Sequence, residues 1–174
     1  DVHDKRWKKH KINFKKIVCT AVSPVYKESE VSIVLVDDSE IHAINKQYRD
    51  GDKPTNVLSF ELGDDVLLGD IYISLDTVKR EAAAANISVA EHTAHMVVHG
   101  MFHLLGYDHL TDAQARVMET KEIKVLKKLG FKNPYADENV TGFKWWKYVL
   151  VGALGGLASL GFAPFNLSWI TILA

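Results

Sequence analysis

The sequence predicts an α+β fold in which helices surround a small mixed β-sheet. Three observations predict it. The 174 residues are 47% hydrophobic and 25% charged, ordinary values for a chain that folds around its own core. Runs rich in β-branched residues at 30–36, 56–62 and 70–75 have the length of strands in a small sheet. Segments with apolar residues at helical spacing lie before, between and after these runs.

The first elements follow from capping and helix-ending residues. Residues 13–23 form the first expected helix, which Pro24 ends because proline cannot continue a helix. After the strand at 30–36, Asp37 or Asp38 can cap the next helix.

The middle of the chain is expected to form two strands and a helix. A loop at 49–55, rich in turn-forming residues, leads to the strand at 56–62. A turn at Gly63 separates this strand from the one at 70–75, and Asp76 starts the helix that follows.

Two capping boxes predict the last two helices. Ser88 with Glu91 opens a helix over about 89–105, and Thr111 with Gln114 opens the final one. The expected order is therefore α-β-α-β-β-α-α-α.

The most informative segment holds His99, His103 and His109 in the pattern H-x3-H-x5-H. The first two lie four residues apart on the predicted helix and so share a face. Gly106 offers a helix stop, after which the chain can fold back and bring His109 toward the same point. Three imidazoles around one divalent ion leave a fourth position open, as in a catalytic metal centre. Zinc is the default metal, and nickel or copper fit the same ligands.

Two more histidines share the helix stripe. Spacing alone permits His95 with His99, or His99 with His103, as the pair that binds the ion. The turn that brings His109 to the end of the helix favours the second pair. We expect His95 either to support a ligand or to lie satisfied in the core. We expect His92 to be exposed.

The residues around the histidines bear on the type of reaction. In the H-E-x-x-H pattern of metalloproteases, a glutamate beside the first ligand is the general base, and here Gly100 stands in its place. A metal-bound water would then ionise unaided or with a group from elsewhere. Asp108, next to a ligand, either orients that ligand or caps the loop.

An arginine offers a phosphate-binding group. Arg49 opens the loop at 49–55, and Lys53 is close by. A guanidinium suits bidentate phosphate contact, and a metal-bound hydroxide beside an arginine can cleave a phosphodiester. The alternative is an arginine that is merely solvated on its loop.

Charge and cysteine content narrow the classes of function. The net charge of −1 excludes a polycation, although residues 5–16 are strongly basic and either contact phosphates or form a solvated face. Cys19 is the only cysteine, which excludes an intrachain disulfide and a cysteine-based zinc site. We expect Cys19 to be buried in the first helix and the chain to be cytoplasmic.

The composition changes after Gly142. Residues 148–174 carry no charge, and the lysines and tryptophans at 144–147 resemble an interfacial flank. We expect a globular domain over 1–142 and a hydrophobic tail over 143–174. The tail is either the truncated start of a membrane domain, in contact with the membrane, or an element packed on the domain.

Four segments together resemble the bacterial YbeY family, the rRNA maturation endoribonucleases. They are the histidine run at 99–109, YR at 48–49 with PTNVLSF at 54–60, LGDI at 68–71, and the helix at 118–126. The similarity covers about residues 12–130. Asn56 stands where the family commonly has Asp, and Glu61 where a proline often follows the phenylalanine.

The resemblance implies one zinc ion held by His99, His103 and His109, and RNA cleavage that depends on Arg49. It implies single-strand-specific endoribonuclease activity in 16S rRNA 3′-end maturation and late ribosome quality control. The implied partners are rRNA, the small ribosomal subunit and ribosomal proteins. The tail at 154–165 is weakly similar to the start of apolipoprotein N-acyltransferase, a membrane enzyme.

Two other functions remain open from the sequence. One is a ribosome-assembly factor that binds its partner and uses the metal only structurally. The other is a metal-dependent hydrolase of a different substrate such as a peptide, against which Gly100 argues.

Overall fold

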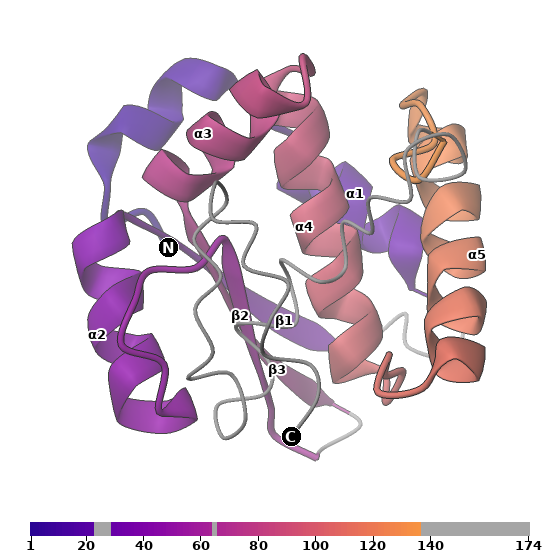
Figure 1. The fold of residues 1–174 in the computed structure, drawn as a ribbon, viewed down its shortest axis with the longest axis horizontal. Helices are drawn as coiled ribbons and strands as arrows, with labels where there is room; N and C mark the ends of the chain where they lie inside the picture. Colours follow the sequence, from indigo (N-terminus) through magenta and orange to yellow (C-terminus); the bar gives the residue numbers. More distant parts are fainter. Residues whose placement is uncertain (23–28, 64–65, 137–174) are drawn as a thin grey trace, which may run out of the picture.

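The computed structural model describes residues 1–22, 29–63 and 66–136 (Figure 1). Within these ranges the order of elements is η1 (Lys5–His10), α1 (Phe14–Ala21), β1 (Glu30–Val36), α2 (Asp38–Arg49), β2 (Val57–Glu61), β3 (Leu67–Ser74), α3 (Leu75–Ala84), α4 (Val89–Leu104) and α5 (Asp112–Leu129). The predicted order of helices and strands is confirmed, with the short 3-10 helix η1 as an addition.

The described strands form one mixed sheet, which confirms the α+β class. Their order is β1-β3-β2, with β1 parallel and β2 antiparallel to β3. Figure 1 shows α2 on one side of this sheet and α4 on the other, with α1 and α5 packed beyond α4. Alternate residues of the strands point to opposite faces of the sheet, where they pack into a small core under α2 and a larger core around α4.

The helix boundaries follow their capping residues. The box of Thr111 and Gln114 is present at the start of α5. At the start of α4 the Ser88 hydroxyl accepts from the Glu91 backbone, whereas the Glu91 carboxylate accepts from the backbone N–H of Lys132. This second contact ties the segment after α5 to the first turn of α4.

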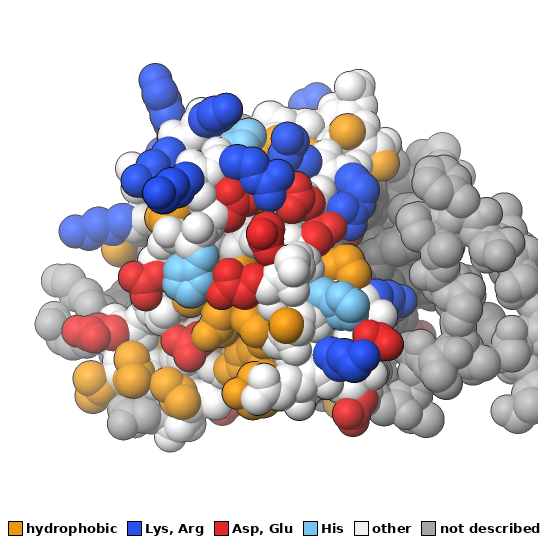
Figure 2. All heavy atoms as spheres, turned by 90° about the vertical axis from the view of Figure 1, so that its left-hand side faces the viewer, with side chains coloured by type: hydrophobic (Ala, Val, Ile, Leu, Met, Phe, Trp, Pro, Cys, Tyr) orange, Lys and Arg blue, Asp and Glu red, His pale blue; other side chains and the backbone are white. Residues whose placement is uncertain are grey.

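The basic stretch at 5–16 contains η1, which sequence periodicity did not predict. Trp7 anchors it, because its indole is buried and donates to the backbone oxygen of Val36 at 3.2 Å. The lysines and arginine of the stretch are exposed, and Figure 2 shows Lys and Arg side chains grouped in the upper part of this face. Arg6 pairs with Asp4 and Asp76, so part of its charge is neutralised.

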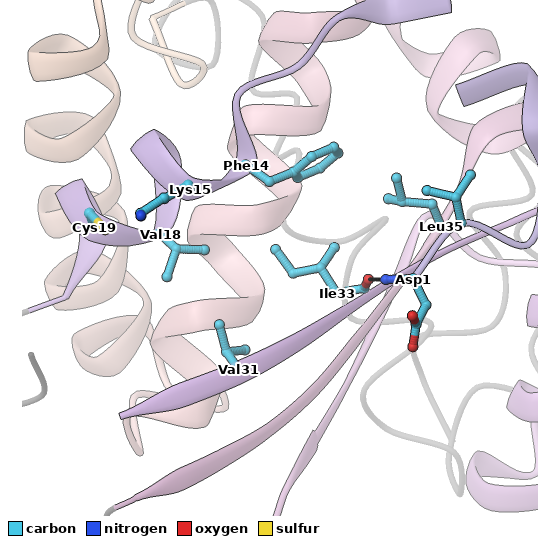
Figure 3. A pocket seen from close by; sticks show the side chains of 9 residues that line it. Asp1, Phe14, Lys15, Val18, Cys19, Val31, Ile33 and Leu35 are labelled. Carbon is cyan, nitrogen blue, oxygen red and sulfur yellow. Dashed lines mark hydrogen bonds between the residues drawn. The ribbon is translucent and has the colours of Figure 1, made fainter. Parts of the chain in front are cut away.

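The prediction that Cys19 is buried is wrong. Helix α1 turns Ile17 and Ala21 toward the core, and Cys19 lies on the exposed side. It borders an apolar hollow between α1 and the edge strand β1, which Figure 3 shows. Phe14 and Ile33 also line this hollow, and the histidines of α4 do not.

Helix α4 is buried on all sides over most of its length. Every residue from His92 to Phe102 is buried, because the sheet, α1, α3 and α5 all pack against it. The prediction that His92 is exposed is therefore wrong. Its ring is 2% exposed, with Nε2 2.6 Å from Glu81 Oε2 on α3. The contact between α3 and α4 is tertiary and leaves no signature in the spacing of the histidines.

No helix in residues 1–22, 29–63 and 66–136 has both the length and the apolarity of a membrane span. The predicted tail at 143–174, its likeness to a membrane enzyme and the boundary at 142 lie outside the described residues.

Asp38 connects α2 to α3. Its carboxylate accepts from Ser74 Oγ at 2.5 Å, from Thr77 Oγ1 at 2.6 Å and N at 3.1 Å, and from Arg80 Nη1 at 2.7 Å. Burial works to raise the pKa of Asp38, but these hydrogen bonds outweigh it and hold the pKa below its usual value.

Replacing Asp38 by alanine is expected to lower the free energy of unfolding by about 2 kcal/mol, because charge-assisted hydrogen bonds are lost. The stabilisation by the carboxylate is present above its unfolded pKa near 3.8 and is lost as the pH falls through the lower folded value. The free energy of unfolding, measured with urea at pH 7 and pH 3, should therefore fall more between these pH values in the parent protein than in Asp38→Ala. Equal pH dependence in the two proteins would contradict this role.

Candidate metal centre

Three imidazole nitrogens meet at the carboxyl end of α4. The Nε2 atom of His103 lies 3.0 Å from Nε2 of His99 and 3.2 Å from Nε2 of His109. Among the described residues these side chains form the group whose ligand atoms all lie within 4.8 Å of one another. Such a cluster of ring nitrogens can hold one metal ion and leave a further coordination position open.

Local chain geometry brings the three side chains together. His99 and His103 are one helical turn apart on α4. The helix then ends in a turn at Gly106, whose φ of 78° is left-handed and whose N–H donates to the backbone oxygen of His103. In the following loop the carboxylate of Asp108 accepts from the backbone N–H of His109 at 2.7 Å. Asp108 thus caps the loop that carries His109, which is one of the two roles considered for it.

The surroundings favour the neutral form of two of these rings, His103 and His109. Burial, together with the neighbouring His99 and His109, lowers the pKa of His103 to about 3. Burial also lowers the pKa of His109. Since only a neutral imidazole has a lone pair to offer, both rings are suited to a cation at neutral pH.

A buried carboxylate lies behind the first of these histidines. Glu122 of α5 is 1% exposed, and its Oε1 lies 2.8 Å from His99 Nδ1. Its Oε2 lies 3.1 Å from His95 Nε2 and accepts from the hydroxyl of Tyr135. Burial works to raise the pKa of Glu122, but its electrostatic interaction with His99 and its hydrogen bonds with His95 and His99 hold that pKa well below its usual range.

Glu122 and Tyr135 were not predicted as functional residues. A signal for Glu122 exists in the sequence, because it is a carboxylate in the buried stripe of α5 between Met118 and Val125. His95 takes up one of its two predicted roles: it supports the carboxylate that contacts His99 and is not in the group of converging nitrogens.

Arg49 is the last residue of α2, and its side chain reaches β2, the edge strand that also packs against α4. Its Nη2 donates to the backbone oxygen of Ser59 on β2 at 2.8 Å, and its guanidinium lies 5.4 Å from the centre of the Phe60 ring. The side chain of Ser59 points to α4, where a Cβ added to Gly100 would lie 2.9 Å from Ser59 Oγ. One residue of β2 thus connects the backbone next to His99 with the arginine.

Lys53, also named from the sequence, lies in a loop held to α2. Its backbone oxygen accepts from Asn45 Nδ2 at 2.8 Å. Burial lowers the pKa of the Lys53 amine.

Residues 1–130 match the family model described as Endoribonuclease YbeY. The chain belongs to the YbeY family. The resemblance seen in the sequence over 12–130 is thereby confirmed. The matched residues include every histidine of the converging group, Arg49 and Glu122, and they end before Tyr135.

Curated YbeY proteins and one solved structure agree with this placement. The chain is 48% identical over 117 residues to Endoribonuclease YbeY of Colwellia psychrerythraea, covering 64% of this chain and 76% of that one. It is 46% identical over 123 residues to Endoribonuclease YbeY of Sphingopyxis alaskensis, covering 63% and 73%. The solution structure of TM1509 from Thermotoga maritima is similar with a TM-score of 0.55 at 27% identity, covering 80% of this chain and 91% of that one.

One departure from the YbeY pattern has a structural explanation. Asn56 donates through Nδ2 to Glu81 Oε2 at 3.0 Å and accepts from the Val57 backbone through Oδ1 at 2.7 Å. Because an ionised aspartate has no donor, it would set two carboxylates against each other here. The amide therefore fits the glutamate that also contacts His92.

Packing explains why residue 100 is a glycine and not the glutamate of the H-E-x-x-H protease motif. A Cβ at this position would lie 2.9 Å from Ser59 Oγ and 3.0 Å from Ile71 Cγ2, so this side of α4 lies directly on the sheet. A carboxylate at residue 100 would enter the core and would not reach a water at the histidines.

Gly100→Ala is expected to lower the free energy of unfolding by about 1–2 kcal/mol, because the methyl group must displace Ser59 Oγ and the buried Ile71 side chain. On an exposed helix surface the same change stabilises by up to about 1 kcal/mol. Urea unfolding of the metal-free proteins measures the sign. A gain in stability would contradict this expectation, because it would show that the sheet side chains under α4 move aside at little cost.

Proposed function

We propose that this chain is a single-strand-specific endoribonuclease that cleaves RNA with a zinc ion held by His99, His103 and His109. The observation that carries the proposal is the convergence of three Nε2 atoms at 3.0 and 3.2 Å, in a chain whose curated relatives are named endoribonucleases. An all-imidazole donor set suits zinc, and its open position suits catalysis. When bound, such an ion lowers the pKa of its water to about 7 and polarises a phosphoryl oxygen.

The chain's own residues supply the remaining functions. Arg49, held by the Ser59 carbonyl and the Phe60 ring, is oriented before substrate arrives and would bind the phosphate next to the cleaved bond. Gly100 leaves no carboxylate beside the first ligand, which favours RNA over a peptide as substrate.

We further propose the cellular setting that the family resemblance implies. The RNA would be the 3′ end of 16S rRNA, and the enzyme would also act in late quality control of ribosomes. Its partners would then be the small ribosomal subunit and ribosomal proteins, in the cytoplasm. The match of residues 1–130 to the Endoribonuclease YbeY family supports this setting.

We further propose that the unit of function ends near residue 142 and that the segment 143–174 is a separate hydrophobic tail. The end of the family match at residue 130 supports the boundary.

The test compares RNA cleavage by the parent protein with His103→Ala, Arg49→Ala and a matched control, Arg116→Ala, which removes an exposed arginine of α5. The parent protein should cleave a single-stranded oligoribonucleotide and spare its duplex. His103→Ala should lose both metal and cleavage. Arg49→Ala should keep one zinc per chain and cleave about 100- to 1,000-fold more slowly, as expected for the loss of one transition-state donor. Arg116→Ala should match the parent.

Two results would overturn the proposal. Intact RNA after incubation with fully zinc-loaded parent protein would leave the metal a structural role. Cleavage at the parent rate by Arg49→Ala would remove the arginine from the mechanism. A 2′,3′-cyclic phosphate among the products would identify the RNA 2′-hydroxyl as the nucleophile, and its absence would indicate water.

A further inference from the structure

Behind the converging histidines lies a buried hydrogen-bond network that the proposed reaction does not use. It joins α4, α5 and the segment after α5 through His95, His99, Glu122 and Tyr135. All four side chains are at most 8% exposed. Both carboxylate oxygens of Glu122 have partners, one on each side of the network.

The contact to His99 determines which ring nitrogen faces the cluster. A carboxylate only accepts, so the 2.8 Å contact requires the proton of His99 on Nδ1. The lone pair then lies on Nε2, the atom that faces His103 Nε2 at 3.0 Å. In the other tautomer the proton would point into the cluster and block a cation.

The other side of the network holds the carboxylate in place. Oε2 of Glu122 contacts the hydroxyl of Tyr135 and lies 3.1 Å from His95 Nε2, and that nitrogen lies 3.1 Å from the Tyr135 hydroxyl. With its second oxygen fixed from two directions, the carboxylate cannot rotate away from His99 without leaving a buried polar group unsatisfied.

We propose that Glu122 is the positioning residue of the metal centre: it sets the tautomer and ring orientation of His99, and Tyr135 with His95 lock Glu122. This inference rests on the metal centre of the proposed function. Tyr135 lies beyond the residues that match the family model, so this part of the lock belongs to the chain outside the match.

A purely structural role, in which Glu122 only joins α5 to α4, must be distinguished. The chain offers a matched control in a second carboxylate–histidine pair, whose histidine also lies on α4. Glu81 of α3 contacts the buried His92 at 2.6 Å, and His92 is not part of the converging group. Glu81→Gln therefore perturbs a carboxylate–histidine pair between α4 and another helix without touching a proposed ligand.

The experiment measures zinc affinity of the full chain by competition with a chromophoric chelator, together with unfolding of the metal-free protein. Glu122→Gln should weaken zinc binding about 10- to 100-fold, the range found when a partner of a metal-bound histidine is removed. Tyr135→Phe, which keeps the carboxylate, should weaken it by a smaller factor of about 2 to 10. Glu81→Gln should alter stability and leave zinc affinity at the parent value.

Unchanged zinc affinity in Glu122→Gln, or an equal loss in Glu122→Gln and Glu81→Gln, would overturn the proposal. If Glu122→Gln does not fold, Tyr135→Phe decides: weaker zinc binding supports the proposal, and parent affinity overturns it. The outcome is separate from that of the proposed function. A protein that loses zinc affinity in Glu122→Gln but never cleaves RNA contradicts only the nuclease, whereas a nuclease with unchanged zinc affinity in Glu122→Gln contradicts only the positioning role.

Discussion

The burial of α4 on all sides is the constraint on which the rest of this structure depends. A helix between a sheet and three other helices gives its polar side chains no water, so each must find a partner within the protein. Four histidines lie on this helix, and their partners differ along its length. His92 meets Glu81 of α3, while His95 and His99 meet Glu122 of α5.

His103 is the member of the stripe whose Nε2 faces two other imidazoles, those of His99 and His109. Ring nitrogens that approach to 3.0 and 3.2 Å in a buried site compete for protons, and burial lowers the pKa of His103 to about 3. A cation relieves this competition, since it accepts lone pairs from all of them at once. The same packing that stabilises the fold therefore prepares the site for a metal ion.

The sheet sets the other side of the site. Gly100 lets α4 lie directly on β2 and β3, and the Ser59 carbonyl at the free edge of β2 holds Arg49. The distance between helix and arginine is thus fixed by one strand. Asp38 holds α2, which carries Arg49 at its end, to the start of α3. Elements on the two faces of the sheet, α2 and α4, thereby contact the same residue of β2, Ser59.

Much of this arrangement could be predicted from local sequence. The helix and turn that gather His99, His103 and His109 depend on spacing and on Gly106, both of which are visible in the chain itself. What could not be predicted depends on tertiary contacts: His92 was expected to be exposed, Cys19 to be buried, and η1 and Tyr135 were missed. The position of the Arg49 side chain likewise depends on its contact with the edge strand β2, which the loop sequence does not predict.

The coordination of bound zinc shows whether the histidine cluster is an open metal centre. X-ray absorption at the zinc edge of the zinc-loaded chain should show three imidazole nitrogens and one oxygen, at about 2.0–2.1 Å. A fourth imidazole nitrogen in place of that oxygen would indicate a closed structural site and rule out an open metal centre.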